Sequence, residues 1–430
     1  MLYSTSAARV RAVLRGGCSK GVSARAMPDP IETIRACLAS PLPPGYRNPG
    51  PRVEHLLAPR EDFVSTLVAE GLQLPQDVVA GLIEIGAVYC CPVPPALPGS
   101  LACEPSSGAR QAALKQHGND TRLSTPRRAS RTSVAPAGAY LRVHAHVKRF
   151  PAADCADWAA RLLAVTDEHV IVNKPCGVPV PITVDNARES VVTQASQAFH
   201  AAQVQQGLCP ASPCAPPTDS QPLHIIHRLD RCTEGVVVLG RGVQAVRAFH
   251  DAQHSGRVQK TYRLLCHGSQ PPPLGLLTHH LAVGTRIPGC PIHSVAHDEP
   301  RPGTAACSLI MESAESAPAL ESVHGGPVID CVVRLVTGRT HQIRAQMAAV
   351  GHPLVGDTLY GPLARRPGQA PVEVAMGDLQ EPELAIGLQA ARMVVMAEDG
   401  ATVLHDWRAP EPWWTQASSC GPQHLASSLQ

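Results

Sequence analysis

From about residue 158 onward, short aliphatic runs of the kind that form buried strands dominate the chain. Residues 170–172 and 236–239 are continuous apolar runs, and residues 329–336 follow a period of two. Helical spacing is rarer and is clearest at 243–250 and 343–350. Many strands with few helices predict a mixed sheet with helices packed on it, which is an α+β fold.

A smaller folded element is expected ahead of this region. Apolar residues recur at helical spacing over 63–68, and Gly71 can end that helix. Pro75 suits the first turn of a second helix, which Gly86 would stop. Residues 87–89 then form a strand, and the run at 139–144 is its natural partner. With 430 residues in the chain, two or three domains are expected.

The range 92–136 separates these two predicted strands. It is rich in Pro, Ser, Gly and Ala, and it holds six Lys or Arg residues against two acidic residues. Such a composition cannot pack a core, so it predicts a disordered basic insertion. A second interpretation is a mobile basic arm that contacts RNA phosphates. We also expect residues 416–430 to form a disordered tail.

Residues 1–28 contain no acidic side chain, but they contain five basic residues among many Ser and Ala. They show no continuous apolar segment of the secretory type. This pattern is typical of an organelle transit peptide, and the alternative is a basic tail with no targeting role. Composition alone does not separate chloroplast from mitochondrion.

Reactive side chains are densest at residues 224–235. Within this segment Asp230 lies between Arg228 and Arg231, at the end of an apolar run. Neighbouring cations favour a charged carboxylate, which can serve as a nucleophile or a base. The alternative is an Asp that only pairs with Arg at a turn.

A second dense segment covers residues 335–344. A strand runs into Gly338 and a helix begins near Thr340, with Arg339 and Arg344 around the helix start. Helix N–H groups and guanidiniums together would favour an anion, either a phosphate or the carboxylate of Asp230. An ordinary capped helix with solvated Arg residues explains the same pattern.

Composition excludes several other classes of protein. The net charge is +2, so any nucleic-acid surface has to be local. No run reaches the roughly 18 apolar residues that span a bilayer, so no membrane association is expected. The 15 Cys are scattered and odd in number, which favours reduced thiols. Cys209, Cys214, His224 and His227 lack zinc-finger spacing, so we expect no metal site.

Several motifs together resemble the pseudouridine synthases of the RluA type. Residues 227–235 read His-Arg-Leu-Asp-Arg-Cys-Thr-Glu-Gly, with Glu234 where that family usually has Ser. The chain also carries the later and earlier motifs of the family in the right order, at 173–177, 260–262, 337–344 and 351–361. The resemblance extends from about residue 158 to residue 362, and the whole arrangement is similar to that of plant chloroplastic members.

This resemblance implies a domain organisation. Residues 158–415 would form a catalytic domain with a mixed, mainly antiparallel β-sheet of the pseudouridine synthase type. Residues 52–150 would form a small α/β S4-like RNA-binding module, split by the insertion at 92–136. A chloroplast location is implied, with the mitochondrion as the alternative.

The resemblance also implies roles for individual residues. Asp230 would be the nucleophile, Tyr262 the aromatic residue that stacks on the target base, and Arg344 the cation paired with the nucleophile. RNA contacts are expected from Arg228, Arg231, Lys174, Arg339, His341 and Gln342. For Lys174 and Arg339 the alternative role is structural support.

The implied reaction detaches uracil from its ribose and rejoins it through carbon-5, without redox change. No cofactor is therefore expected, and the chain has no Gly-rich nucleotide loop. The substrate would be organellar ribosomal, transfer or messenger RNA, bound by a monomer. One alternative is a catalytically inactive RNA-binding protein that retains the fold. Another is a carboxylate-dependent hydrolase of nucleosides or sugars, which would need a second acid near Asp230.

Overall fold

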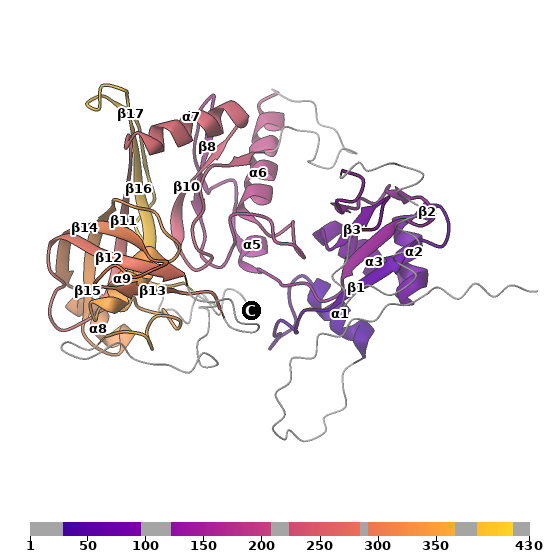
Figure 1. The fold of residues 1–430 in the computed structure, drawn as a ribbon, viewed down its shortest axis with the longest axis horizontal. Helices are drawn as coiled ribbons and strands as arrows, with labels where there is room; N and C mark the ends of the chain where they lie inside the picture. Colours follow the sequence, from indigo (N-terminus) through magenta and orange to yellow (C-terminus); the bar gives the residue numbers. More distant parts are fainter. Residues whose placement is uncertain (1–28, 96–121, 208–222, 284–290, 366–384, 416–430) are drawn as a thin grey trace, which may run out of the picture. The chain divides into compact units, whose positions relative to one another are not determined.

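A computed structural model describes residues 29–95, 122–207, 223–283, 291–365 and 385–415. The described chain divides into two compact units. Unit 1 consists of residues 29–151 together with 182–190, and unit 2 consists of residues 152–181 and 191–415 (Figure 1). The expected transit peptide, the expected tail and residues 96–121 of the expected insertion lie outside the described residues.

Unit 1 is a four-stranded antiparallel sheet with helices packed on it. The strand order is β1-β6-β3-β4, and a separate two-stranded pair joins β2 to β5. Apolar side chains of the helices and of one sheet face form a single core. In chain order the elements are α1 (Pro30–Leu38), β1 (Val53–Leu57), β2 (Asp62–Phe63), α2 (Val64–Leu72), α3 (Gln76–Ile85), β3 (Val88–Cys91), β4 (Arg127–Arg128), β5 (Val134–Ala135) and β6 (Tyr140–His144).

Most of the expected elements of unit 1 are present. Helix α3 ends at Gly86, which adopts a φ of +86° that favours glycine. Strands β3 and β6 pair with Tyr89 opposite Arg142, as the sequence predicts. The predicted disorder of 92–136 is wrong for its last part. There β4 and β5 pair with neighbouring strands, and Ala129 and Ala135 are buried. The composition averaged over the whole range predicts disorder and does not reveal these two short strands.

Residues 182–190 belong to unit 1 although 30 residues of unit 2 precede them. The Arg149 guanidinium pairs with the Glu189 carboxylate at 2.5 Å, and both side chains are almost completely buried. Tyr89 donates a hydrogen bond from its hydroxyl to the Val184 carbonyl at 2.6 Å. The amide of Ala187 donates to the carbonyl of Ile85 at 2.8 Å. A segment distant in sequence therefore completes unit 1.

Unit 2 is built on an 11-stranded sheet. Its strand order is β13-β12-β14-β15-β11-β16-β10-β8-β7, with β17 on β16 and β9 on β10. All described pairs are antiparallel except β10 with β16, so the predicted mixed, mainly antiparallel sheet is confirmed. The strands are β7 (Leu162–Val165), β8 (His169–Lys174), β9 (His224–Ile225), β10 (Glu234–Gly240), β11 (Val258–His267), β12 (Gly275–Val283), β13 (Ser294–His297), β14 (Ala305–Ser316), β15 (Val328–Leu335), β16 (Leu388–Met396) and β17 (Val403–Arg408).

Helices accompany this sheet at several points (Figure 1). The helices predicted at 243–250 and 343–350 are present, each with slightly different bounds. The helices are α5 (Ala152–Cys155), α6 (Val191–Gln205), α7 (Val243–His254), α8 (Pro318–His324) and α9 (Gln342–Ala349). No helix in the described part of the chain is long and apolar enough to cross a membrane.

Candidate active site

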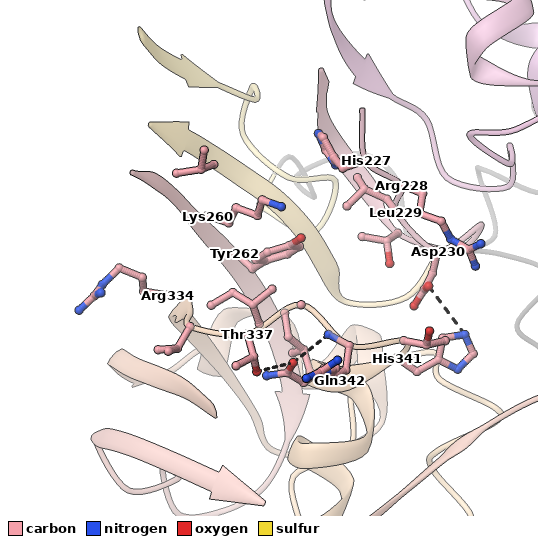
Figure 2. A pocket seen from close by; sticks show the side chains of 18 of the residues that line it. His227, Arg228, Leu229, Asp230, Lys260, Tyr262, Arg334, Thr337, His341 and Gln342 are labelled. Atoms are coloured by element: carbon pink, nitrogen blue, oxygen red, sulfur yellow. Dashed lines mark hydrogen bonds and ion pairs between the residues drawn. The ribbon is translucent and has the colours of Figure 1, made fainter. Parts of the chain in front are cut away.

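Both reactive segments that stand out in the sequence line one cavity of unit 2, with a volume of about 740 Å³. One wall is the loop that precedes β10 and carries Asp230. The strand β11 contributes Lys260 and Tyr262, and the turn between β15 and α9 closes the other side (Figure 2). Residues more than 100 positions apart in the sequence therefore meet at one point.

Lys174, the last residue of β8, holds the Asp230 loop through hydrogen bonds to its backbone. The Lys174 ammonium is completely buried and donates hydrogen bonds to the carbonyls of Pro175, Arg231 and Thr233, at 2.6 to 3.0 Å. Burial lowers the pKa of Lys174 to about 8. Of the two roles expected for Lys174, complete burial favours structural support over a contact with an RNA phosphate.

Gly235 allows β10 to begin directly after the loop. Its φ is +113°, and a Cβ at this position would lie 2.3 Å from the carbonyl oxygen of Ala390 in β16. Any side chain would force the two strands apart. The carboxylate of the preceding residue, Glu234, does not line the cavity. It accepts hydrogen bonds from the side-chain amide of Gln389 and the backbone amide of Trp413. The loop therefore presents a single carboxylate, that of Asp230, to the cavity.

Two cationic or titratable groups face the Asp230 carboxylate. Arg344 Nη1 lies 3.6 Å from Oδ2, and His341 Nε2 lies 3.7 Å from Oδ1. The Asp230 side chain keeps 22% of its surface exposed, whereas Arg344 is buried. The nucleophile predicted from sequence thus lies beside the predicted basic partner, with an oxygen accessible from the cavity.

Arg344 is held by a second carboxylate, that of Asp357. Its Nε and Nη2 donate to the two Asp357 oxygens at 2.7 and 2.9 Å, a bidentate arrangement. Asp357 also accepts hydrogen bonds from the backbone amides of Leu359 and Tyr360. This anchoring leaves Nη1 of Arg344 directed at Asp230.

The His341 ring is positioned in a comparable way. His341 has a φ of +53°, in the left-handed region that non-glycine residues rarely adopt. Its Nδ1 lies 3.2 Å from the hydroxyl of Tyr360, and that hydroxyl accepts a hydrogen bond from the Ser294 amide at 2.7 Å. The unusual backbone turns the ring towards the Asp230 carboxylate (Figure 2).

Tyr262 supplies the aromatic wall of the cavity. The register of β11 against β16 shifts between Thr261 and Tyr262, and such irregularities re-aim side chains near functional sites. Burial is the main cause that raises the pKa of Tyr262, with the Asp230 charge second, so the phenol stays protonated.

The other residues predicted to contact RNA fall into three groups. Arg228 and Arg339 are exposed and line the cavity. Arg231 does not line it, and its carbonyl is occupied by Lys174 and Gly177. Gln342 also lines the cavity, but its side chain is almost completely buried. Its buried amide is saturated within the protein: the oxygen accepts from the Thr337 hydroxyl and the Arg339 amide, and the nitrogen donates to the Ser308 carbonyl and the Gln346 amide.

Some residues of the site escaped the sequence reasoning. Asp357 and Tyr360 lie in the motif at 351–361, which was used only as a sign of the family. This motif follows the helix that carries Arg344 by only a few residues, and that proximity in sequence could have indicated that Asp357 pairs with Arg344. Lys260 belongs to the motif at 260–262, for which a role was predicted only for Tyr262.

The described residues contain no cluster of three or more His, Cys, Asp or Glu side chains suited to a metal ion. Cys209 and Cys214, the thiols that were weighed as zinc ligands, lie outside these residues.

Comparison with known proteins places this site in a family. Residues 168–349 match the RNA pseudouridylate synthase family. The chain is 33% identical over 418 residues to chloroplastic RNA pseudouridine synthase 6 of Arabidopsis thaliana, covering 86% of this chain and 82% of the relative. It is 32% identical to the rice protein of the same name, covering 87% and 82%. The dual-specificity synthase RluA of Escherichia coli strain K12 is 27% identical, covering 45% and 74%. The chain therefore belongs to the RNA pseudouridine synthase family, which is a family of isomerases.

Proposed function

We propose that this protein converts uridine to pseudouridine in RNA with Asp230 as the nucleophile. The observation that carries the proposal is the partly exposed Asp230 carboxylate in a 740 Å³ cavity, faced by Arg344 and lined by Tyr262. Within the loop that bears it, no second acid is presented to the cavity, since Glu234 is bound elsewhere. This arrangement disfavours the hydrolase alternative, which requires a pair of carboxylates.

The chemistry needs one bond broken and one bond formed. The carboxylate assists cleavage of the bond between uracil N1 and the ribose C1′. The uracil then turns, and C5 bonds to C1′. The hydrogen leaves C5 and N1 ends protonated, so atoms and electrons balance without a co-reactant. Arg344 stabilises the negative charge of the carboxylate and fixes its orientation.

The target uridine has to leave its stack to reach Asp230, at a cost of a few kcal/mol. Tyr262 is suited to stack on the flipped base, because its ring forms one wall of the cavity. Arg228 and Arg339 are exposed beside the cavity, where they can contact the RNA backbone. His341, by contrast, is directed at the nucleophile.

We further propose that unit 1 is an S4-like module that adds RNA contacts outside the cavity. The chloroplastic relatives support an organellar RNA as substrate and the chloroplast as the location, with residues 1–28 as a transit peptide. Plastid ribosomal, transfer and messenger RNA are all compatible with a site that receives one flipped uridine.

Replacing Asp230 by Asn tests the proposal. Asn keeps the shape of the side chain but removes the nucleophilic oxygen, so pseudouridine formation should fall by about 10⁴-fold or more. Pseudouridine mapping of plastid RNA incubated with each protein measures the effect, and filter binding measures affinity for the same RNA. Affinity should change little.

Asp251→Asn is the matched control, since Asp251 is an exposed carboxylate on α7. It should retain full activity. Conversion by Asp230→Asn at the unsubstituted rate would refute the nucleophile. A complete lack of conversion by the unsubstituted protein, with RNA binding intact, would favour the inactive RNA-binding alternative.

A further inference from the structure

Lys260 is a cation in the cavity for which the proposed chemistry has no use. It lies on β11, two residues before Tyr262, and both side chains line the cavity. Figure 2 shows the two side chains extending from β11 in the same direction. Residues i and i+2 of a strand are about 6.6 Å apart, so the ammonium lies roughly one strand repeat from the stacking ring.

The surroundings of Lys260 lack a counter-ion. Its Nζ donates to the neutral amide oxygen of Gln253 at 2.8 Å, and no carboxylate among the described residues pairs with it. Two other cations of the cavity lining do have a counter-ion, since Arg334 pairs with Glu312 at 2.9 Å and Arg344 pairs with Asp357 at 2.7 Å. Burial lowers the pKa of Lys260 to about 8, consistent with an unfavourable isolated charge.

A half-buried ammonium without a counter-ion gains from a ligand that brings a full negative charge. Uracil and ribose are neutral, and the phosphodiester is the anionic group of RNA. We propose that Lys260, positioned by Gln253, forms a phosphate subsite that binds one backbone phosphate next to the flipped uridine. The inference rests on the proposed function, because it takes RNA as the ligand.

The volume of the cavity agrees with this assignment. At about 740 Å³ it has room for more than a single nucleoside beside Asp230. Lys260 and Gln253 border it from β11 and α7, whereas Asp230 and His341 border it from the loop and the helix start. A nucleotide bound with its base on Tyr262 can therefore place its phosphate at Lys260.

The test measures equilibrium binding of a fluorescein-labelled hexamer of oligouridylate to the full-length protein as a function of salt. Each phosphate neutralised on a single strand contributes about 0.7 to the slope of log K against log salt. Lys260→Met should reduce the slope by about that amount and weaken binding about tenfold at low salt. Lys260→Arg, which keeps the charge, should retain the slope.

Gln253→Glu gives an independent test that leaves the lysine in place. Gln253 is exposed, so the change should not disturb folding. The new carboxylate would supply the missing counter-ion and compete with phosphate, so the salt slope should fall as it does in Lys260→Met. Arg247→Met, an exposed cation on α7 outside the cavity, is the matched control and should keep the slope.

Hexamers that carry one neutral methylphosphonate at successive positions identify the phosphate. One position should weaken binding to the unsubstituted protein and have no effect on Lys260→Met. No hexamer binding, an unchanged slope in Lys260→Met and Gln253→Glu, or reduced turnover at an unchanged slope would overturn the subsite.

These outcomes are separable from the proposed function. If the slope falls as expected but the unsubstituted protein forms no pseudouridine, the subsite stands and the isomerase proposal fails. If pseudouridine forms normally and the slope is unchanged, the isomerase proposal stands and the subsite fails.

Discussion

At the scale of single residues, the site depends on how one guanidinium is shared between two carboxylates. Arg344 gives two of its nitrogens to Asp357 and leaves the third 3.6 Å from Asp230. The tight pair with Asp357 fixes the arginine, and at the longer distance the Asp230 side chain stays partly exposed. Lysine could not replace this arginine, because an ammonium lacks the planar fork that binds Asp357.

Replacing Asp357 by Asn should harm catalysis more than RNA binding. The neutral amide cannot hold the buried guanidinium, so Arg344 should shift towards Asp230 and draw the nucleophile out of position. Breaking a buried ion pair also costs about 3–5 kcal/mol of stability. We expect kcat to fall at least tenfold with little change in KM, and steady-state kinetics together with urea unfolding measure both effects.

Asp298→Asn is the comparison for this prediction, since the exposed Asp298 carboxylate accepts hydrogen bonds from Nη1 of Arg365 through both of its oxygens. It should alter both quantities slightly. An equal rise in KM with unchanged kcat in Asp357→Asn would show that the buried pair acts on substrate binding instead.

At the scale of elements, the end of β8 supports the loop before β10. Lys174 satisfies three backbone carbonyls around that loop, two of which belong to the residues that follow Asp230. The antiparallel strand pair of β8 with β10 therefore supports the loop that carries Asp230.

Lys174→Met tests the platform. Methionine fills the space but leaves three carbonyls without a donor, each costing about 1–3 kcal/mol when buried. The free energy of unfolding should therefore fall by several kcal/mol, and activity should fall because the loop loses its support. Chemical unfolding measures the first effect. Lys148→Met, at an exposed lysine, should leave stability almost unchanged.

Sequence reasoning succeeded for elements with local signals and failed for those set by distant partners. Asp230, Tyr262 and Arg344 lie in dense motifs, and Gly86 is a local stop signal for α3. The burial of Lys174 depends on carbonyls about 57 to 59 residues away, which no local pattern reveals. Strand β4 was hidden for a similar reason, because its pairing with β3 outweighs a composition that otherwise indicates disorder.

At the scale of the whole molecule, the two units are interleaved along the chain. Residues 182–190 leave unit 2 and complete unit 1, where Glu189 binds the Arg149 guanidinium and the amide of Phe150. Asn186 donates to the same carboxylate. Removing residues 52–150 would therefore expose a buried carboxylate, so a loss of RNA affinity in this deletion would not by itself locate RNA contacts in unit 1.

A point substitution tests the interleaving more cleanly. Arg149→Met removes the buried guanidinium that binds Glu189 and leaves it only the partly buried Arg188, 3.2 Å away, so the stability of unit 1 should fall by about 3–5 kcal/mol. The double variant Arg149→Met with Glu189→Met should recover much of that loss, since an apolar pair can replace a buried ion pair. Thermal unfolding of both variants measures this. Equal stability of the single and double variants would show that the loss does not come from the unpaired charge of Glu189.

The return of residues 182–190 to unit 1 also has a consequence for biosynthesis. Proteins emerge from the ribosome starting at the N-terminus, and early domains usually fold before later ones are made. Here the first unit must wait until Ser190 has left the exit tunnel, when the opening strands of the second unit are already outside. Unit 1 therefore stays incompletely folded for longer during synthesis than the length of residues 29–151 implies. Chaperones would be most important in this period.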